Sequence, residues 1–378
     1  NKAAKEIFFD GDDPLSEGMR LIQSDLAKTL RQIAAKGSDG FYKGPIADAI
    51  VKDMTAHGGL LTEADLSGYR VRQRIPVRGR YRDHEIISMP PPSSGGIHII
   101  QMLNVLEGYD LRATGWKTAE TCHLIVETMR QAYADRAAFL GDPDFVTVPT
   151  KRLTSTNYAT ISRDAIQKNK ARDSSDIHPG AIAPKESRST THLSIVDPQG
   201  NVISTTQTIN YSFGACVVVP GTGILLNNEM DDFSSKPGVP NIFGLLGNEA
   251  NAIEPKKRPL SSMTPTIVLK DKKPYLILGT PGGSTIITSV MQNILNVVLH
   301  DMDIKEAVSS PRVHSQWIPD VVYYEQYGLS SDVVENMKSR GHDMNLRGDI
   351  GEANGIMINE KGYWGGADSR GENKAIGY

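Results

Sequence analysis

The stretch TTHLSIVD, residues 190–197, decides how the fold of this chain is interpreted. It alternates apolar and polar side chains, which is typical of a half-buried β-strand. The turn-forming run DPQGN at 197–201 and a second alternating stretch at 202–208 follow directly. This order predicts a β-hairpin that begins at Thr190. Two threonines at the start of a strand are usually explained by their β-propensity alone.

Thr190 also allows a chemical interpretation, because it stands where a polar segment ends and a strand begins. From Ala165 to Ser189 the sequence is polar and lacks periodicity, which favours a mobile linker. If the chain cut its own bond between Ser189 and Thr190, the new α-amino group, with a pKa of about 7.7–8.0, could serve as base for the threonine hydroxyl. We therefore hypothesise that Thr190 is an N-terminal nucleophile. An ordinary interdomain linker is the alternative.

The composition excludes several classes of protein. A chain of 378 residues that is 39% hydrophobic and 22% charged can bury a large core as a soluble globular protein. A net charge of −3 gives no basic surplus for nucleic acid or an anionic membrane. The most apolar run, 286–299, contains polar residues and is too short to span a bilayer, so it predicts a core helix. The chain has two cysteines and no metal-ligand spacing among its histidines, so we expect neither a disulfide framework nor a metal site.

Helices dominate the expected first half of the chain, and strands dominate the second. The expected elements are a helix capped by Ser24, helices beginning at Pro45 and Thr62, a helix over 117–139, strands over 266–270 and 275–278, and a helix over 285–300. This pattern predicts an α+β fold with helices on both sides of two packed antiparallel sheets. Asp135 and Arg136, adjacent in the long helix, are interpreted as an ion pair without a catalytic role.

Three short motifs could form a binding or catalytic site. Gly282 and Gly283 lie between a strand and a helix, where backbone N–H groups and the helix dipole could bind a phosphate or an oxyanion. The cluster NNEMDD at 227–232 could hold a substrate ammonium or Ca²⁺, or could form a solvated turn. The hydroxyls of Ser261 and Ser262 could bind a carboxylate, but neither serine lies in the Gly-x-Ser-x-Gly turn of a serine hydrolase.

Taken together and in this order, the motifs resemble those of the γ-glutamyltranspeptidase family of N-terminal nucleophile hydrolases. They are MPPPSSGG at 89–96, YADR at 133–136, GDPDF at 141–145, TTH at 190–192, LLNNEMDDF at 225–233, KRPLSSM at 257–263 and GTPGGS at 279–284. The resemblance implies a four-layer αββα sandwich. It also implies self-cleavage into a large subunit that ends at Ser189 and a small subunit, 190–378, which together form one intertwined domain.

The resemblance also implies a reaction. Thr190 would attack the γ-amide carbonyl of glutathione or another γ-glutamyl compound, and Thr208 would hydrogen-bond the attacking hydroxyl. The N–H groups of Gly282 and Gly283 would stabilise the oxyanion. The γ-glutamyl group would then pass from the enzyme to water or to an acceptor amino acid or peptide. The family needs no cofactor or metal for this chemistry and works in the periplasm or outside the cell.

Substrate recognition follows from the same resemblance. Asn210, Glu229 and Asp232 would hold the substrate α-amino group, because carboxylates and an amide oxygen suit an ammonium ion. Ser261 and Ser262 would hold the α-carboxylate.

Two departures from the family pattern lead to further expectations. The family's large subunit begins well before the position of Asn1, and that earlier part supplies an arginine for the α-carboxylate, so we interpret the chain as part of a longer precursor. Phe243 lies where several relatives have a lid tyrosine, which predicts a looser lid. Two alternatives stay open: an acylase acting on cephalosporin side chains or polyglutamate, and an unprocessed, inactive relative with a binding role.

Overall fold

The computed structural model describes residues 1–177, 190–236, 238–241 and 244–377, which form two compact units. The first comprises Asn1–Arg74 and Ile209–Asn228, and the second Ile75–Thr208 and Glu229–Tyr378. Each unit therefore contains residues from both sides of the proposed cut. The Ser189–Thr190 bond itself lies outside the described residues, as does Phe243.

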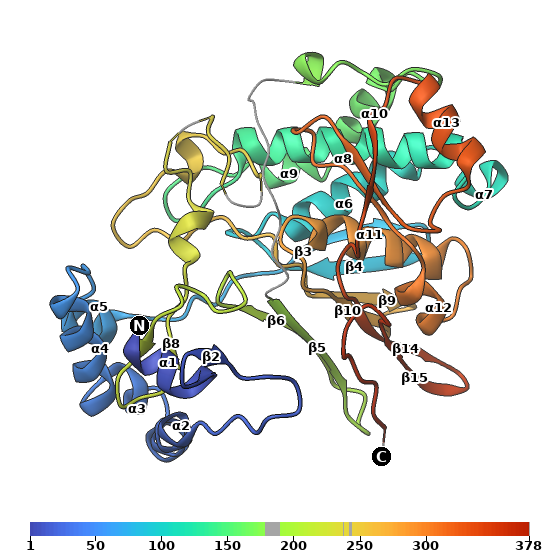
Figure 1. Ribbon diagram of the computed structural model, residues 1–378. Helices are drawn as coiled ribbons and strands as arrows, with labels where there is room; N and C mark the ends of the chain where they lie inside the picture. Colours follow the sequence, from blue (N-terminus) through green and yellow to red (C-terminus); the bar gives the residue numbers. More distant parts are fainter. Residues whose placement is uncertain (178–189, 237, 242–243, 378) are drawn as a thin grey trace. The chain divides into compact units, whose positions relative to one another are not determined.

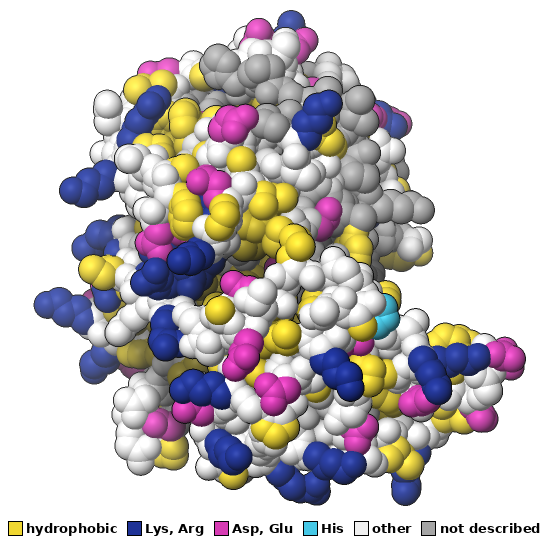
Figure 2. Space-filling model, turned by 90° about the vertical axis from the view of Figure 1, so that its left-hand side faces the viewer, with side chains coloured by type: hydrophobic (Ala, Val, Ile, Leu, Met, Phe, Trp, Pro, Cys, Tyr) yellow, Lys and Arg dark blue, Asp and Glu magenta, His cyan; other side chains and the backbone are white. Residues whose placement is uncertain are grey.

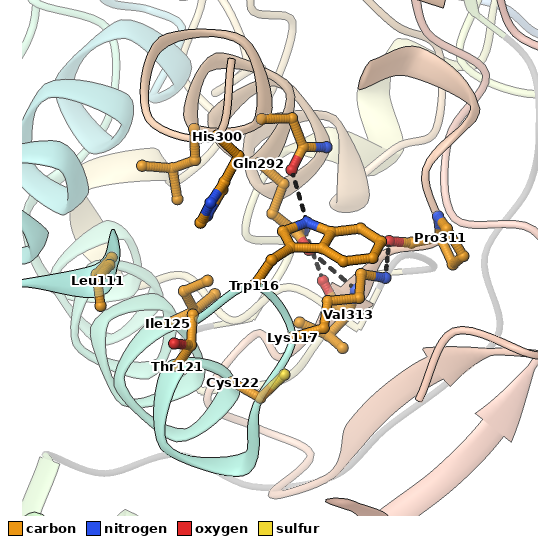
Figure 3. Close-up of a pocket in the computed structure, with 12 residues that line it drawn as sticks. Leu111, Trp116, Lys117, Thr121, Cys122, Ile125, Gln292, His300, Pro311 and Val313 are labelled. Atoms are coloured by element: carbon orange, nitrogen blue, oxygen red, sulfur yellow. Dashed lines mark hydrogen bonds between the residues drawn. The ribbon is translucent and has the colours of Figure 1, made fainter. Parts of the chain in front are cut away.

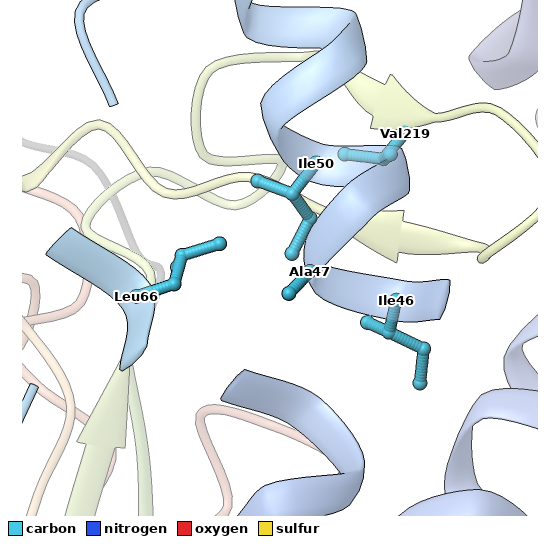
Figure 4. Packing of buried hydrophobic residues seen from close by; sticks show 5 residues of the cluster. All are labelled: Ile46, Ala47, Ile50, Leu66 and Val219. Carbon is cyan, nitrogen blue, oxygen red and sulfur yellow. The ribbon is translucent and has the colours of Figure 1, made fainter. Parts of the chain in front are cut away.

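The first unit is a small helical body with two short β-pairs. Its elements are α1 (Lys2–Phe8), β1 (Phe9–Asp10), β2 (Asp13–Pro14), α2 (Ser24–Lys36), α3 (Asp39–Tyr42), α4 (Pro45–Ala56), α5 (Glu63–Gly68), β7 (Val218–Val219) and β8 (Ile224–Leu225). Helix α4 begins at Pro45, as predicted, and the predicted capping box between Thr62 and Asp65 is present. Ser24 instead follows the cap residue Gln23 and makes no cap bond. The side chains of Ile46, Ala47, Ile50, Leu66 and Val219 form the buried core (Figure 4).

The second unit is built on a six-stranded sheet. Its order is β15-β14-β10-β9-β4-β3, and the strands are Gly362–Ala367, Asn354–Asn359, Lys273–Gly279, Thr266–Lys270, His84–Ser88 and Val77–Tyr81. All neighbours in this sheet are antiparallel. The predicted hairpin forms as β5 (Thr190–Val196) and β6 (Val202–Thr208) and packs on β10 and β14 (Figure 1).

Helices cover the opposite face of the sheet. The helices of this unit are α6 (Gly95–Leu106), α7 (Leu111–Thr114), α8 (Ala119–Phe139), α9 (Thr150–Leu153), α10 (Thr156–Ala165), α11 (Thr285–Val298), α12 (Ile304–Ser309) and α13 (Ser331–Ser339). Helices α6 and α11 pack on the sheet and α8 packs on α6 (Figure 1). A three-stranded sheet, β11 (Val313–His314), β12 (Val322–Glu325) and β13 (Met344–Arg347), completes the unit. The α+β prediction is confirmed, with helical, sheet and hairpin layers in that order.

Helix α11 is the predicted core helix, since every residue from Thr285 to Val298 is buried. No helix of the described residues is long and apolar enough to cross a membrane. On the face drawn in Figure 2, acidic and basic side chains are interspersed, in keeping with the small net charge of −3.

The polar segment that follows α10 differs from the prediction of a mobile linker in its described part. Arg172 donates from Nε to Glu127 Oε2 at 2.7 Å, and Ser174 accepts a 2.8 Å hydrogen bond from Arg130. Ile177 is also buried. A buried ion cluster therefore fixes this stretch to α8, which composition alone could not indicate, because the partner Glu127 lies 45 residues away from Arg172. Residues 178–189 are outside the described residues.

We predict that Glu127→Ala destabilises the second unit by about 3–5 kcal/mol, because it removes the buried carboxylate that Arg130 and Arg172 share and leaves Arg130 with the more exposed Asp320. Burial alone would raise the pKa of Glu127. The guanidinium groups of Arg130 and Arg172 together have a larger effect and lower this pKa, so the carboxylate is ionised near neutral pH. Chemical denaturation of the full-length protein measures the loss. The matched control is Arg112→Ala, which breaks the exposed ion pair with Asp301 and should cost far less stability than Glu127→Ala. Equal losses in the two variants would contradict the prediction.

Candidate active site

Thr190 is the first residue of β5 and lies opposite Thr208, the last residue of β6. The two hydroxyls are in contact, with Thr190 Oγ1 donating to Thr208 Oγ1 at 3.3 Å. Both residues are half-buried. The hairpin register alone brings these two predicted residues together, although they lie 18 positions apart in the sequence.

His192 fixes the same face of the hairpin against the sheet. Its ring packs so closely on Gly279 that a Cβ at that glycine would lie 2.3 Å from His192 Nδ1. The two ring nitrogens lie 2.8 Å from Thr206 Oγ1 and 3.1 Å from Ser194 Oγ. Burial lowers the pKa of His192 to about 4, so the ring is neutral at pH 7. Both nitrogens are thus engaged by hydroxyls of the hairpin, which makes His192 a packing residue and not a base for Thr190.

The glycine loop follows β10 directly. Gly282 and Gly283 have φ values of +133° and +54°, which favour glycine, and α11 begins two residues later at Thr285. The backbone N–H and the hydroxyl of Thr285 both donate to the Gly282 carbonyl, at 2.9 and 2.7 Å. The predicted strand–glycine–helix arrangement is therefore present. Because Gly279 ends β10, the contact with His192 ties this loop to the Thr190 hairpin.

Glu229 and Asp232 lie in one short 3₁₀ helix, Glu229–Asp232. Burial raises the pKa of Asp232 well above its usual value and the Glu229 carboxyl raises it further, while Arg136 opposes the shift. Burial also raises the pKa of Glu229. Two adjacent buried carboxyls retain a shared proton more readily than isolated ones. Within the described residues, no group of three or more His, Cys, Asp or Glu is placed to hold a metal ion.

Ser261 and Ser262 are held by the PPPSSGG turn. The backbone N–H of Ser261 donates to the Pro92 carbonyl at 2.8 Å, and the backbone N–H of Ser94 donates to the Ser261 carbonyl at 2.9 Å. The hydroxyl of Ser94 donates to the same carbonyl at 3.0 Å. Two predicted motifs that are far apart in the sequence therefore form one rigid segment.

Arg136 joins this segment from α8 and was missed as a site residue. Its Nη2 donates to Ser262 Oγ at 3.2 Å, and its Nε donates to Ser94 Oγ at 3.0 Å. The predicted ion pair between Asp135 and Arg136 is wrong, because consecutive helical side chains point in different directions. Asp135 instead accepts hydrogen bonds from Gln101 at 2.6 Å and Tyr158 at 2.8 Å, and burial raises its pKa to about 6.

Asn210 belongs to the first unit. It is buried, has a φ of +72°, and donates from Nδ2 to the Asn228 carbonyl at 3.1 Å. The side chain of Asn228 in turn accepts from the backbone N–H of Tyr211 at 2.9 Å. The amide of Asn210 is therefore held by the residues that follow β8.

The sequence model of the family described as Gamma-glutamyltranspeptidase matches residues 1–378. The chain belongs to the γ-glutamyltranspeptidase family. It is 48% identical over 368 residues to the glutathione hydrolase proenzyme of Escherichia coli (strain K12), covering 97% of this chain and 63% of that protein. It is 41% identical over 362 residues to the acylase ACY 1 proenzyme of Pseudomonas sp. (strain SE83), covering 96% of this chain and 62% of that protein. The chain thus spans less than two thirds of the length of these relatives.

The fold has a solved relative as well. The crystal structure of cephalosporin acylase from Bacillus halodurans superimposes with a TM-score of 0.85 at 26% identity, covering 100% of this chain and 67% of that one. This similarity extends the family assignment to the N-terminal nucleophile hydrolase fold.

A cavity between α8 and α11 contains none of the predicted site residues of this family member (Figure 3). Trp116 donates from Nε1 to Asn296 Oδ1 at 3.2 Å, and Lys117 Nζ donates to the Pro311 carbonyl. Burial lowers the pKa of Lys117 to about 8. The nucleophile hypothesis does not involve this cavity.

We predict that Gly279→Ala costs about 1–3 kcal/mol of stability, because the new methyl group would displace the His192 ring and with it the hairpin. Gly68→Ala is the matched control, since a Cβ there meets nothing within 4 Å. That change should be neutral or stabilise by about 0.4–1 kcal/mol. Thermal and chemical unfolding of the two variants measure the difference, and a harmless Gly279→Ala would show that the close packing of His192 is dispensable.

Proposed function

We propose that the protein transfers and hydrolyses γ-glutamyl groups of glutathione and related γ-glutamyl amides through a γ-glutamyl ester on Thr190. The observation that carries this proposal is the direct contact between the hydroxyls of Thr190 and Thr208 in a chain 48% identical to a glutathione hydrolase proenzyme. We further propose that cleavage before Thr190 yields two subunits of one precursor, and that the protein works in the periplasm or outside the cell.

In the proposed mechanism, cleavage of the Ser189–Thr190 bond liberates the α-amino group of Thr190. This amine accepts the proton of the Thr190 hydroxyl while the oxygen attacks the γ-carbonyl carbon of the substrate. The N–H groups of Gly282 and Gly283 stabilise the oxyanion. The tetrahedral intermediate then expels the leaving amine, which takes the proton, and water or an acceptor amine attacks the ester in the second half.

The two charged groups on the α-carbon of the γ-glutamyl group are recognised by opposite chemistry in this proposal. The α-ammonium binds the carboxyls of Glu229 and Asp232. The α-carboxylate binds the hydroxyls of Ser261 and Ser262, whose segment is fixed by the PPPSSGG turn. A half-buried carboxyl pair favours a substrate that brings a positive charge, since removing a carboxylate from water without a contacting cation is costly.

Acylase activity is the second candidate, because one relative is an acylase ACY 1 proenzyme and a cephalosporin acylase shares the fold. A glutaryl group lacks the α-amino group, so it would bring no cation to the half-buried Glu229–Asp232 pair. Rates with glutathione and with a glutaryl-cephalosporin separate the two candidates. An unprocessed relative with a binding role would hydrolyse neither compound and would migrate as one intact band on a denaturing gel.

We predict that Thr190→Ala abolishes both chain cleavage and turnover. Removing a nucleophile typically lowers the rate by roughly 10⁴-fold or more. A denaturing gel and a glutathione hydrolysis assay on the full-length protein report the two effects. The control is Thr191→Ala, which alters the exposed neighbouring threonine and should leave both processes intact. Turnover retained in Thr190→Ala would refute the nucleophile assignment.

The carboxyl pair also predicts a pH dependence of substrate binding. Because the pKa values of Glu229 and Asp232 are raised, the free pair holds a proton at a pH where ordinary carboxyls are ionised. An ammonium ligand favours the ionised pair, so binding releases that proton and becomes tighter as pH rises through the titration of the pair. The KM for γ-glutamyl-p-nitroanilide should therefore fall with rising pH, and the KM for glutaryl-p-nitroanilide should not. Parallel profiles for the two substrates would contradict the assignment of this pair to the α-amino group.

A further inference from the structure

Arg136 is a buried cation whose contacts are hydroxyl groups. The residue is 4% exposed, and its guanidinium donates to Ser94 and Ser262. Among the described residues it forms no ion pair at contact distance, although the negative charge of Asp232 acts on it. Burial lowers its pKa to about 10, so it stays protonated at neutral pH. Burying a guanidinium without a contacting carboxylate is costly, which indicates that the positive charge of Arg136 has a functional role at this position.

The hydrogen bond from Arg136 determines what Ser262 can do. A guanidinium has no acceptor, so the Ser262 hydroxyl must accept from it and must direct its own hydrogen elsewhere. Ser261 is in the same situation, because its Oγ accepts from the backbone N–H of Met263 at 3.0 Å. The two hydroxyls are thereby left to act as donors. Accepting from a charged donor also polarises the Ser262 O–H and strengthens the bond that it donates.

Arg136 also acts electrostatically on its surroundings. Its guanidinium contacts the Ser262 hydroxyl and lies within electrostatic reach of Asp232, whose pKa it lowers against the effect of burial. Arg136 therefore adds positive potential at the serine pair and favours ionisation of the acidic pair. Both effects favour a ligand that carries a carboxylate and an ammonium on one carbon.

We propose that Arg136 is a positioning residue that sets the specificity of the site for a substrate with an α-carboxylate, by holding Ser262 as a hydrogen-bond donor and by supplying positive charge behind it. The proposal rests on the proposed γ-glutamyl function and adds a residue that acts through Ser262 without touching the substrate.

The test compares two substrates that differ in the α-carboxylate alone. γ-Glutamyl-p-nitroanilide carries both the amine and the carboxylate, and 4-aminobutyryl-p-nitroanilide carries only the amine. For Arg136→Met in the full-length protein, we expect the KM of the first substrate to rise roughly ten- to a hundredfold, the range of a lost charge-assisted hydrogen bond. The KM of the second substrate should change less than about threefold. Arg136→Lys keeps the charge and loses the planar set of guanidinium N–H donors. Its KM for the first substrate should lie between those of the wild type and Arg136→Met.

Arg130→Met is the matched control, because it removes another buried arginine from the same helix, six residues before Arg136, where Glu127, Asp320 and Ser174 are its contacts. It should lower thermal stability and leave the KM ratio of the two substrates unchanged. If Arg136→Met raises both KM values equally, or if its ratio matches that of Arg130→Met, the residue has a structural role and the proposal is wrong.

A binding measurement separates this proposal from the proposed function. Thermal stabilisation by L-glutamate and by 4-aminobutyrate needs no turnover, and it can be measured with Arg136→Lys where Arg136→Met does not fold. Loss of the preference for L-glutamate supports the role of Arg136, and an unchanged preference overturns it. A wild-type protein that binds L-glutamate but cleaves neither anilide would refute the γ-glutamyl transfer reaction and leave the assignment of Arg136 standing.

Discussion

The close contact between the His192 ring and the backbone of Gly279 holds the candidate site together. It joins the β5–β6 hairpin to β10 at the residue where β10 ends and the glycine loop begins. The hydroxyl of Ser204 adds a 3.2 Å hydrogen bond to the Leu278 carbonyl, one residue earlier. Thr190 is two residues from His192 on the same face of the hairpin, so its position relative to the loop is set by this packing. A Cβ at position 279 would occupy the place of the imidazole, so the absence of a side chain at this glycine lets the ring pack on the backbone.

The remaining polar groups of the site are organised by charge. Half-buried carboxyls lie in the 3₁₀ helix Glu229–Asp232, and a buried guanidinium contacts Ser262 of the serine pair. In a medium of low effective dielectric these opposite charges act on one another over distances at which water would screen them. The raised pKa of Asp232 and the lowered pKa of Arg136 show that burial opposes both charges. A ligand with both an ammonium and a carboxylate, as the proposed function requires, would offset this cost at both clusters.

Features with local causes could be predicted from the sequence, and features with distant partners could not. The hairpin from Thr190, the capping box at Thr62 and the core helix α11 follow from alternation, cap residues and an apolar run, and the structure confirms them. The contact of Thr190 with Thr208 followed from the family resemblance and is consistent with the hairpin register. The role of Arg136 was missed because its partners lie 42 and 126 residues away in the sequence. Consecutive helical residues do not face each other, and this rule alone would have excluded the Asp135–Arg136 pair.

The sheet of the second unit explains how a cut before Thr190 could leave the molecule intact. Strand β4 precedes that position and β9 follows it, yet the two are neighbours in the six-stranded sheet, with five residue pairs from His84–Lys270 to Ser88–Thr266 in register. In the first unit, the hydroxyl of Thr29 donates to the Thr222 carbonyl at 2.8 Å, again across the same position. Sheet hydrogen bonds and core packing form cooperatively and do not depend on one peptide bond. The chain could therefore lose the bond before Thr190 and gain a free amine there, because the contacts described for Thr190 are made within the hairpin, which packs on the sheet.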